Sequence, residues 1–297
     1  MNRMLLILLA AVWFVIAVAL TAFMMYGINK QSLSFLHYDF INNFFDERND
    51  KYADSNDKTS AGSLTVSYNA DEVHDLNINL VSEKVTVKKA TDSKVTVEVT
   101  THRSEKYRPV VRLSGSTLEI NESSDYHKQW YNYFRQETVV LYLPSDCQIN
   151  SLYVDLVSGE VKVSSLNAKK MKLHSVSGAI TADGCISDSL TADTTSGSIT
   201  YDGALRSFDC HSISGAVRVA LSKMLTDDSF AETVSGSVRV TLPENDGFIL
   251  RYDTVSGRVH DEFSGSSIGH GSGEFTYKTN GPIVSLKTVS GSISVEE

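Results

Sequence analysis

The chain has 297 residues, of which 41% are hydrophobic, and carries a formal net charge of −9. Its 27 lysines and arginines form no dense block, which argues against nucleic-acid binding because phosphate contacts need clustered basic residues. The three cysteines, Cys147, Cys185 and Cys210, are too few and too unevenly spaced for a disulfide framework or a zinc site.

The N-terminus predicts a membrane anchor. Residues 1–4 form a short tail before an uncharged, proline-free run of 24 residues from Leu5 to Ile28. A bilayer-spanning helix needs about 20 apolar residues, whereas the apolar core of a cleaved signal peptide has about 7–15. We therefore predict a single-pass transmembrane helix over 5–28, although Ala17-Val18-Ala19 keeps a cleaved signal peptide as the alternative. Because the remainder is rich in β pattern and suggests export, we expect residues 1–4 in the cytoplasm and the C-terminal part outside the cell membrane.

Residues 29–62 link this helix to the rest of the chain. Apolar residues at helical spacing over 29–45 predict either a short helix on the membrane surface or a continuation of the membrane helix as a stalk. The polar stretch 46–62 has almost no aliphatic residues and predicts a flexible linker.

An N-terminal β region is expected over 63–145, where aliphatic and polar residues alternate in short runs such as 76–80 and 95–99. One loop of this region is unusually aromatic. It predicts either a recognition patch, since aromatics anchor many interfaces, or a cover over the open end of the repeats that follow. The aromatic residues of this insert are Tyr126, Trp130, Tyr131, Tyr133 and Phe134.

The C-terminal region, residues 146–297, contains seven copies of Ser-Gly followed, after one residue, by Val or Ile. Successive glycines are 19, 19, 18, 21, 21 and 34 residues apart, and Ser272-Gly273 divides the last interval as an eighth, weaker copy. Repeats near 20 residues are typical of stacked units that bury an apolar face only against their neighbours. The repeated glycines, which we interpret as structural turn residues, are Gly159, Gly178, Gly197, Gly215, Gly236, Gly257 and Gly291.

Alignment of the copies on their glycines predicts which side chains face inward. Aliphatic residues two and four positions after each glycine alternate with polar residues, as in a strand with one buried face. Before the glycine, positions minus five and minus two are also mainly apolar, which requires a bend that small residues tolerate. The sequence therefore predicts an all-β fold: a parallel β-solenoid with rungs of about 18–21 residues, preceded by irregular β-strands and the transmembrane helix. A sandwich of hairpins is the alternative.

Two stretches, 138–163 and 238–259, share a strand that ends in Leu-Pro, a polar turn, a second strand and then Val-Ser-Gly-x-Val. This arrangement resembles the bacterial putative-adhesin family of β-strand-repeat domains, over roughly residues 76–295. The resemblance implies a membrane-anchored or surface-exposed protein, similar in some members to envelope-stress proteins, and it supplies no catalytic residues.

Polar residues four positions before the glycines form a candidate ladder. Alternating carboxylate and imidazole groups about 4.8 Å apart favour either a divalent-metal or acid-responsive face, or a solvated ladder in which unlike neighbours avoid repulsion. The solvated ladder is the simpler interpretation, so we predict no metal and no cofactor. The ladder residues are Asp155, His174, Asp193, His211, Glu232 and Asp253, with Lys287 in the same column.

No catalytic residues are predicted. The stretch 265–269 matches Gly-x-Ser-x-Gly, but that motif signifies a nucleophile only on a strand-to-helix turn. The chain is therefore expected to be a non-catalytic interaction or envelope-sensing module at the cell surface, with an unknown protein or envelope component as partner. A structural spacer or scaffold and, less favoured, a carbohydrate-active enzyme are the alternatives. We expect the last rung, at 293–297, to be an open edge that Glu296 and Glu297 blunt or that pairs with a second copy.

Overall fold

The computed structural model describes residues 64–297 except for 104, 125–136, 146, 269 and 280. In this part the chain is all-β, with 21 strands in one mixed, largely parallel sheet and two short 3₁₀ helices, η1 (Ala70–Glu72) and η2 (Glu105–Tyr107). No helix among these residues is long and apolar enough to cross a membrane, and the predicted span 5–28 lies outside them.

The strands of the N-terminal region are β1 (Leu64–Asn69), β2 (Asp75–Leu80), β3 (Lys84–Lys89), β4 (Lys94–Thr100), β5 (Val110–Ser114), β6 (Thr117–Asn121) and β7 (Thr138–Leu143). The central strands are β8 (Ile149–Leu156), β9 (Val161–Ser164), β10 (Asn167–Ser175), β11 (Ile180–Thr194), β12 (Ile199–Ser212), β13 (Val217–Leu221), β14 (Ser229–Ser235) and β15 (Val238–Thr241). The last strands are β16 (Gly247–Thr254), β17 (Val259–Asp261), β18 (Ser266–Ile268), β19 (Gly271–Lys278), β20 (Ile283–Ser290) and β21 (Ile293–Glu296).

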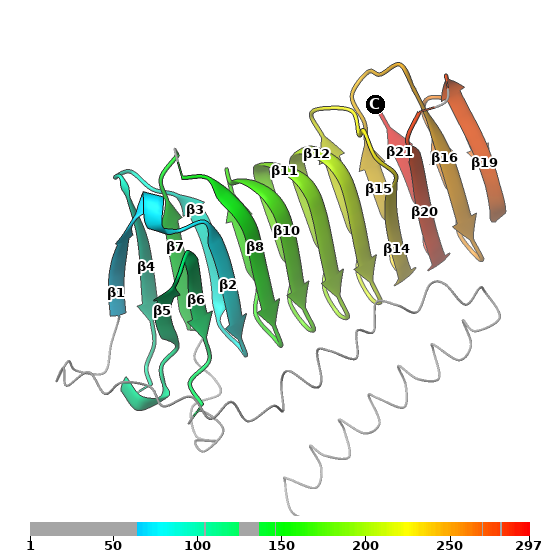
Figure 1. Ribbon diagram of the computed structural model, residues 1–297. Helices are drawn as coiled ribbons and strands as arrows, with labels where there is room; N and C mark the ends of the chain where they lie inside the picture. The colour runs from blue at the N-terminus through cyan, green and yellow to red at the C-terminus, as the bar shows by residue number, and fades with distance from the viewer. Residues whose placement is uncertain (1–63, 104, 125–136, 146, 269, 280) are drawn as a thin grey trace, which may run out of the picture. The chain divides into compact units, whose positions relative to one another are not determined.

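Each repeat, here called a rung, has one strand before its Ser-Gly turn and one after it. The strands before the turns pair in parallel, so that Leu152, Met171 and Leu190 stand opposite one another in three successive rungs. The strands after the turns do the same, with Val161, Ile180 and Ile199 in register. The parallel stacking of repeats is therefore confirmed, and the hairpin sandwich does not describe the central rungs. Figure 1 shows the strands side by side in one long row.

The N-terminal region continues this row of rungs. β2 pairs in parallel with β8, and β3 with β9, so residues before 146 supply a rung of their own. β6 and β7 add a further rung on β2 and β3. Antiparallel pairs occur only toward the two ends of the described sheet, where β5 lies on β6, β4 on β7 and β1 on β4, and where β19 lies on β16 and β18 on β17.

The C-terminal rung does not lie at the end of the row. β20 pairs with β14 on one side and β16 on the other, and β21 pairs with β15 and β17. In Figure 1 the red strands β20 and β21 accordingly lie between β14–β15 and the orange β16. The expectation that 293–297 forms an open edge is thus wrong, because backbone groups on both sides of β21 are paired. The Ser272-Gly273 copy is also not a rung, since β19 is antiparallel to β16.

The repeat correctly predicted which residues face the interior after each glycine, but not which residues face it before the glycine. The residues two and four positions after each glycine are buried, including Val161 and Val163. The residues at minus two were expected to face inward and instead lie half-exposed on the outside, with Val255 54% exposed. The bend lies at the Ser-Gly turn itself, so the strand before it keeps its alternation, and minus three and minus five face inward. Cys147, Cys185 and Cys210 are all buried.

The minus-three position is a feature of the repeat that the sequence analysis missed. From the second Ser-Gly rung onward it is always serine or threonine, and each hydroxyl donates to the carbonyl oxygen of the glycine in the neighbouring rung, as Ser175 Oγ does to Gly159 at 2.9 Å. In the first Ser-Gly rung this position holds Leu156, and the neighbouring rung has Glu83 in place of a glycine. The buried hydroxyls belong to Ser175, Thr194, Ser212, Thr233, Thr254 and Thr288.

The repeated glycines allow the rungs to approach closely. A Cβ built on Gly178 would lie 1.8 Å from the carbonyl oxygen of Gly159, and the other repeated glycines meet the carbonyl before them in the stack in the same way. None of the seven has a positive φ, so these glycines are needed for space and not for left-handed backbone.

Candidate functional site

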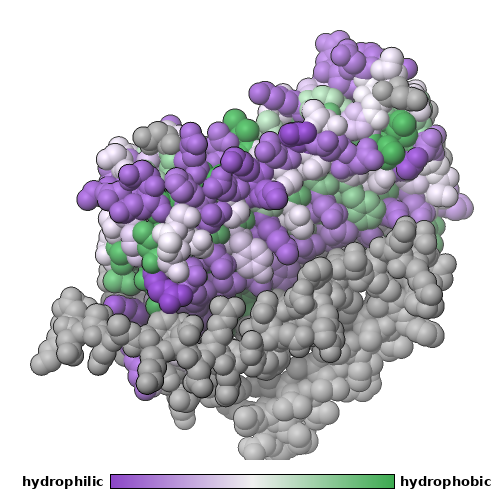
Figure 2. All heavy atoms as spheres, viewed as in Figure 1, coloured by the Kyte–Doolittle hydropathy of each residue, from purple (hydrophilic) through white to green (hydrophobic). Residues whose placement is uncertain are grey.

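The predicted polar ladder exists and runs along the outer face of the strands that precede the turns. The pairing brings Asp155, His174, Asp193, His211 and Glu232 into adjacent positions in that order. Because the last rung is inserted before the preceding one, Lys287 follows Glu232, and Asp253 comes after Lys287. Lys287 therefore lies between the carboxylates of Glu232 and Asp253, an order that differs from their order in the sequence. Figure 2 shows that the visible face of the described part is mainly hydrophilic, with hydrophobic spots among the polar residues.

Both histidines of the ladder contact a carboxylate. His174 Nδ1 lies 2.7 Å from Oδ1 of Asp155 in the neighbouring rung. His211 Nε2 lies 2.8 Å from Asp209 Oδ1, two residues away on the same strand. Burial lowers the pKa of His211, but the hydrogen bond to Asp209 and the charges of Asp209, Asp193 and Glu232 outweigh it, so the net shift is upward. Burial also raises the pKa of the Asp193 and Glu232 carboxyls.

This geometry fits a ladder of paired charges better than a metal centre. Each histidine is oriented by its own carboxylate, and the two histidines are separated by the whole rung that carries Asp193. Among the residues that the structure describes, no group of three or more histidine, cysteine or acidic side chains is arranged to hold a metal ion.

A second polar site lies at the N-terminal end of the glycine column. Residues 81–85 read Val-Ser-Glu-Lys-Val, a copy of the repeat in which Glu83 replaces the glycine. A Cβ on Gly159 would lie 2.0 Å from the carbonyl oxygen of Glu83, so Glu83 continues the column. In the next rung outward, β6 and β7 are joined by residues 122–137 in place of a tight Ser-Gly turn. The aromatic insert therefore occupies the turn position of its rung.

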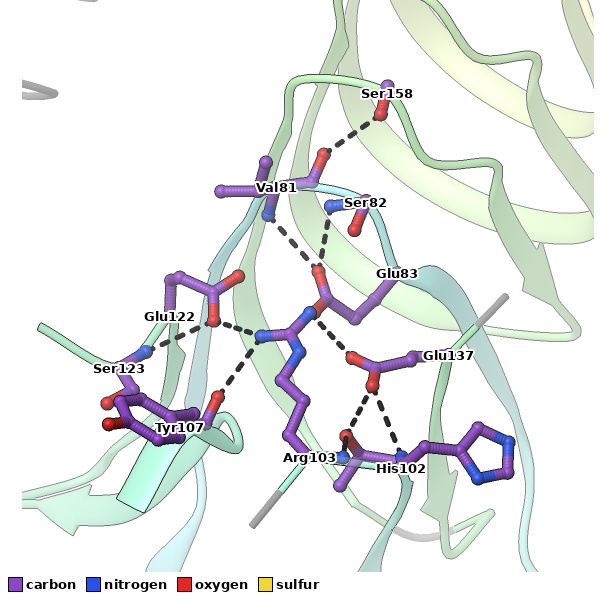
Figure 3. Close-up of polar contacts among 11 residues, drawn as sticks. Val81, Ser82, Glu83, His102, Arg103, Tyr107, Glu122, Ser123, Glu137 and Ser158 are labelled. Atoms are coloured by element: carbon purple, nitrogen blue, oxygen red, sulfur yellow. Dashed lines mark hydrogen bonds and ion pairs between the residues drawn. The ribbon is translucent and has the colours of Figure 1, made fainter. Parts of the chain in front are cut away.

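Arg103 holds three buried carboxylates together at this point (Figure 3). Its Nη2 contacts Glu83 and lies 2.5 Å from Glu137 Oε2, and its Nη1 contacts Glu122 and donates to the carbonyl oxygen of Tyr107 at 3.3 Å. The arginine side chain is 8% exposed, and those of Glu83, Glu122 and Glu137 are 0%, 13% and 8% exposed. We call these four residues the Arg103 cluster.

Backbone and hydroxyl donors complete the Arg103 cluster. Glu83 Oε2 accepts hydrogen bonds from the backbone amides of Val81 and Ser82 at 3.1 and 2.9 Å. Glu137 Oε1 accepts from Thr101 Oγ1 at 2.5 Å and from the amide of His102 at 3.2 Å. Because Glu122 directly follows β6 and Glu137 directly precedes β7, the cluster ties together the two points from which the insert departs.

Three carboxylates around one guanidinium leave an excess of negative charge. Burial and the neighbouring Glu83 raise the pKa of Glu122 to about 8, despite the opposing effect of Arg103. Glu122 Oε2 is buried and accepts no hydrogen bond. The raised pKa favours the protonated form of Glu122, which reduces the charge of the cluster.

The ladder and the insert were predicted from the sequence, but the Arg103 cluster was not. The signal that could have revealed it is the Val-Ser-Glu-Lys-Val match at 81–85, because a glutamate in a column of glycines needs a partner. The predicted recognition residues Tyr126, Trp130, Tyr131, Tyr133 and Phe134 lie outside the described residues.

Comparison with protein families identifies the stacked rungs. Residues 73–296 match the family model described as Toastrack DUF4097. The chain belongs to the Toastrack DUF4097 family. The Toastrack match begins just before β2 and ends with β21, so it contains the Arg103 cluster, the insert and the whole ladder. The resemblance to the bacterial putative-adhesin family is thereby confirmed. No curated protein matches the chain.

Several solved bacterial structures are similar to this Toastrack chain. A "putative adhesin" from Bacteroides fragilis is 14% identical, with a TM-score of 0.47 over 80% of this chain and 98% of that one. A "putative lipid binding protein" from Parabacteroides distasonis is 15% identical, with a TM-score of 0.42 over 79% and 97%. A "putative cell adhesion protein" from Clostridium sporogenes is 12% identical, with a TM-score of 0.37 over 79% and 98%.

The hydrolase-like stretch 265–269 of this Toastrack chain lacks the backbone context that the motif needs. Residues Ser266–Ile268 form β18, which pairs antiparallel with β17. A nucleophile elbow requires a turn between a strand and a helix, and the described residues after β18 continue as β19.

Proposed function

We propose that this Toastrack protein is a non-catalytic binding module, anchored in the cell membrane by residues 5–28 and displayed on the outer side. The single observation that best supports a binding role is that both ends of the aromatic insert are held by buried contacts. Among the rungs that the structure describes, the one formed by β6 and β7 lacks the tight turn at the glycine column, and the residues at both ends of its longer connection, Glu122 and Glu137, belong to the buried Arg103 cluster. A loop held on a rigid scaffold is the usual arrangement of a recognition site.

The composition of the insert fits this role. Tyrosine and tryptophan supply large contact area at small entropic cost, and they dominate the binding energy of many interfaces. We therefore propose Tyr126, Trp130, Tyr131, Tyr133 and Phe134 as the contact residues, with a protein or other envelope component as the partner. We interpret the rungs as a β-solenoid that serves as the rigid support of this loop, which also includes the scaffold role of the alternative hypothesis.

Location is tested by protease treatment of intact and lysed cells that carry a C-terminal tag on the full chain. Cleavage in intact cells is expected. Protection until lysis would place the rungs inside the cell and contradict surface binding.

Contact is tested by placing a photoreactive amino acid at Tyr131 and, as a control, at the exposed Asp202 on β12, which lies away from the Ser-Gly turns. Irradiation of intact cells should give a discrete adduct from position 131 and none from position 202. Equal adducts from both positions, or none from either, would contradict a recognition role for the insert and leave the spacer interpretation.

A further inference from the structure

We propose that β19 is a docking edge for a second copy of this chain, in which the β19 strands of two molecules pair antiparallel across a two-fold axis at Thr276. This goes beyond the proposed function, because it concerns the opposite end of the row of rungs from the insert. Figure 1 shows β19 at one extreme of the row and β1 at the other.

β19 is the longest strand of the described sheet that pairs on one side only. It has eight residues, all in continuous register with β16, whereas the other strands with one neighbour, β1, β5 and β18, have six, five and three. It contains no proline and its pairing has no bulge. Its two end residues have positive φ, Gly271 at 126° and Lys278 at 51°, and the residues between them have none. An edge of this length is a template for another strand, and natural proteins usually shorten, bulge or twist an edge that must stay single.

The two faces of β19 differ, which restricts the register of any partner strand. Phe275 and Tyr277 are half-buried toward the interior, while Glu274 and Thr276 are exposed on the outer face. Lys278, at the end of the strand, is also exposed, and its Nζ donates to the carbonyl oxygen of Asn245 at 2.9 Å, a bond that it would exchange for Glu274 of the second copy. Directly opposite residues share a face, so a shift by one residue would place aromatic side chains against polar ones. The registers that remain are those whose two-fold axis passes through a residue of the strand.

Charge selects among these registers. An axis at Glu274 would oppose this carboxylate with its own copy, and like charges directly opposite are destabilising. An axis at Thr276 pairs Glu274 with Lys278 of the second copy, Thr276 with Thr276, and Phe275 with Tyr277. Arg251 Nε already lies 2.7 Å from Glu274 Oε2 on the other side, so the row across the dimer alternates cation, carboxylate and cation.

In the dimer, the aromatic residues on the inner face of β19 in the two copies would form one continuous apolar cluster. Phe263 and Tyr277 have ring centroids 4.7 Å apart, and Phe248 lies 5.1 Å from Phe263 and 5.7 Å from Tyr277. Phe263, Phe275 and Tyr277 are only partly buried in the single chain. Cross-strand aromatic pairs of Phe275 with Tyr277 would cover part of this exposed surface.

Disulfide trapping in native membranes tests the geometry with the full chain. In the proposed register the two Thr276 Cα atoms are about 4.5–5.5 Å apart, within the range of a disulfide. Thr276→Cys should therefore give a cross-linked dimer on mild oxidation. Ser272→Cys is the matched control on the same exposed face: its two Cα atoms would be about 27 Å apart and should not cross-link. The three native cysteines are buried and contribute no background.

A charge exchange in the Thr276→Cys chain provides a second test. Glu274→Lys or Lys278→Glu alone creates two like-charge pairs per dimer and should lower the dimer yield roughly 3- to 30-fold. The two exchanges combined with Arg251→Glu should restore the yield, because Arg251 would otherwise lie opposite a second cation at position 274. Absence of a Thr276→Cys dimer, equal cross-linking from Ser272→Cys, adducts with another protein in place of the dimer, or failure of the triple exchange to restore the yield would each overturn the proposal.

Discussion

Thr233 Oγ1 donates to the carbonyl oxygen of Gly215, one rung away, at 2.8 Å, and Thr233 is fully buried. The same contact recurs between each buried serine or threonine of the minus-three column and the neighbouring glycine. The hydroxyl column therefore adds side-chain bonds between the rungs to the backbone hydrogen bonds that continue into the turn, such as that from the amide of Ser235 to the carbonyl oxygen of Ile213.

Thr233→Val should lower the free energy of unfolding by about 1–3 kcal/mol, because the methyl group keeps the shape but removes the donor to a buried carbonyl. Thr233→Ser should retain the donor and cost less. Denaturant unfolding measures both values, and equal losses in the two variants would show that the methyl group, and not the hydroxyl, stabilises the turn.

Gly197→Ala should also destabilise the stack. A Cβ at this position would lie 2.1 Å from the carbonyl oxygen of Gly178, so neighbouring rungs must move apart. Overpacking of this kind costs typically 1–3 kcal/mol. Ser196→Ala, at the exposed neighbouring position, is the control and should leave the thermal midpoint nearly unchanged. A stable Gly197→Ala chain would contradict the view that these glycines are required for close approach.

The Arg103 cluster should make stability fall as the pH rises. The pKa of Glu122 is raised from 4.5 to about 8 by burial and by Glu83, so the folded state holds a proton that the unfolded state releases. The stabilising effect of that proton is complete below about pH 4.5 and is lost as the pH rises toward 8.

Glu122→Gln should flatten this part of the pH profile, since the amide carbonyl still accepts from Arg103 and carries no charge. Thermal unfolding of both chains between pH 5 and about 9 provides the measurement. Glu105→Gln, on an exposed side chain, is the control and should leave the slope unchanged. A wild-type profile as flat as that of the variant would mean that Glu122 is ionised in the folded protein.

Deletion of Ile293–Glu296 and Glu297 should weaken the fold beyond the loss of a terminal tail. β21 pairs with β15 and β17, and Ile293 and Val295 are fully buried. Loss of these two side chains alone should remove roughly 3–6 kcal/mol, and β16–β19 should become sensitive to protease. Deletion of Glu297 alone is the control. Unchanged protease resistance in the longer deletion would contradict the placement of this rung between its neighbours.

Much of the fold followed from the spacing of the glycines. The period near 20 residues predicted stacked rungs, and the alternation after each glycine predicted the inward positions of Val161, Val163 and their equivalents, which are buried. The ladder from Asp155 to Glu232 was predicted for the same reason, because parallel strands in register repeat the same face.

Where two interpretations fitted the pattern, the prediction made from the sequence was wrong. Apolar residues at minus two, such as Val157 and Val176, were assigned to the interior because hydrophobicity was taken as burial. They lie on the outside because the bend comes at the glycine. The Arg103 cluster was missed because Arg103, Glu83, Glu122 and Glu137 come from four separate segments and contact one another only after folding.

The sequence by itself determined that this protein is a stack of β rungs with an N-terminal apolar segment, because a repeated pattern of side chains leaves each rung dependent on identical neighbours. Only the tertiary structure decided the order of those rungs and which strand forms the edge. Parallel pairing needs a matching register, and the rung at Gly291 matches both Gly236 and Gly257. No local feature of the sequence indicates that the rung at Gly291 lies between the rungs at Gly236 and Gly257.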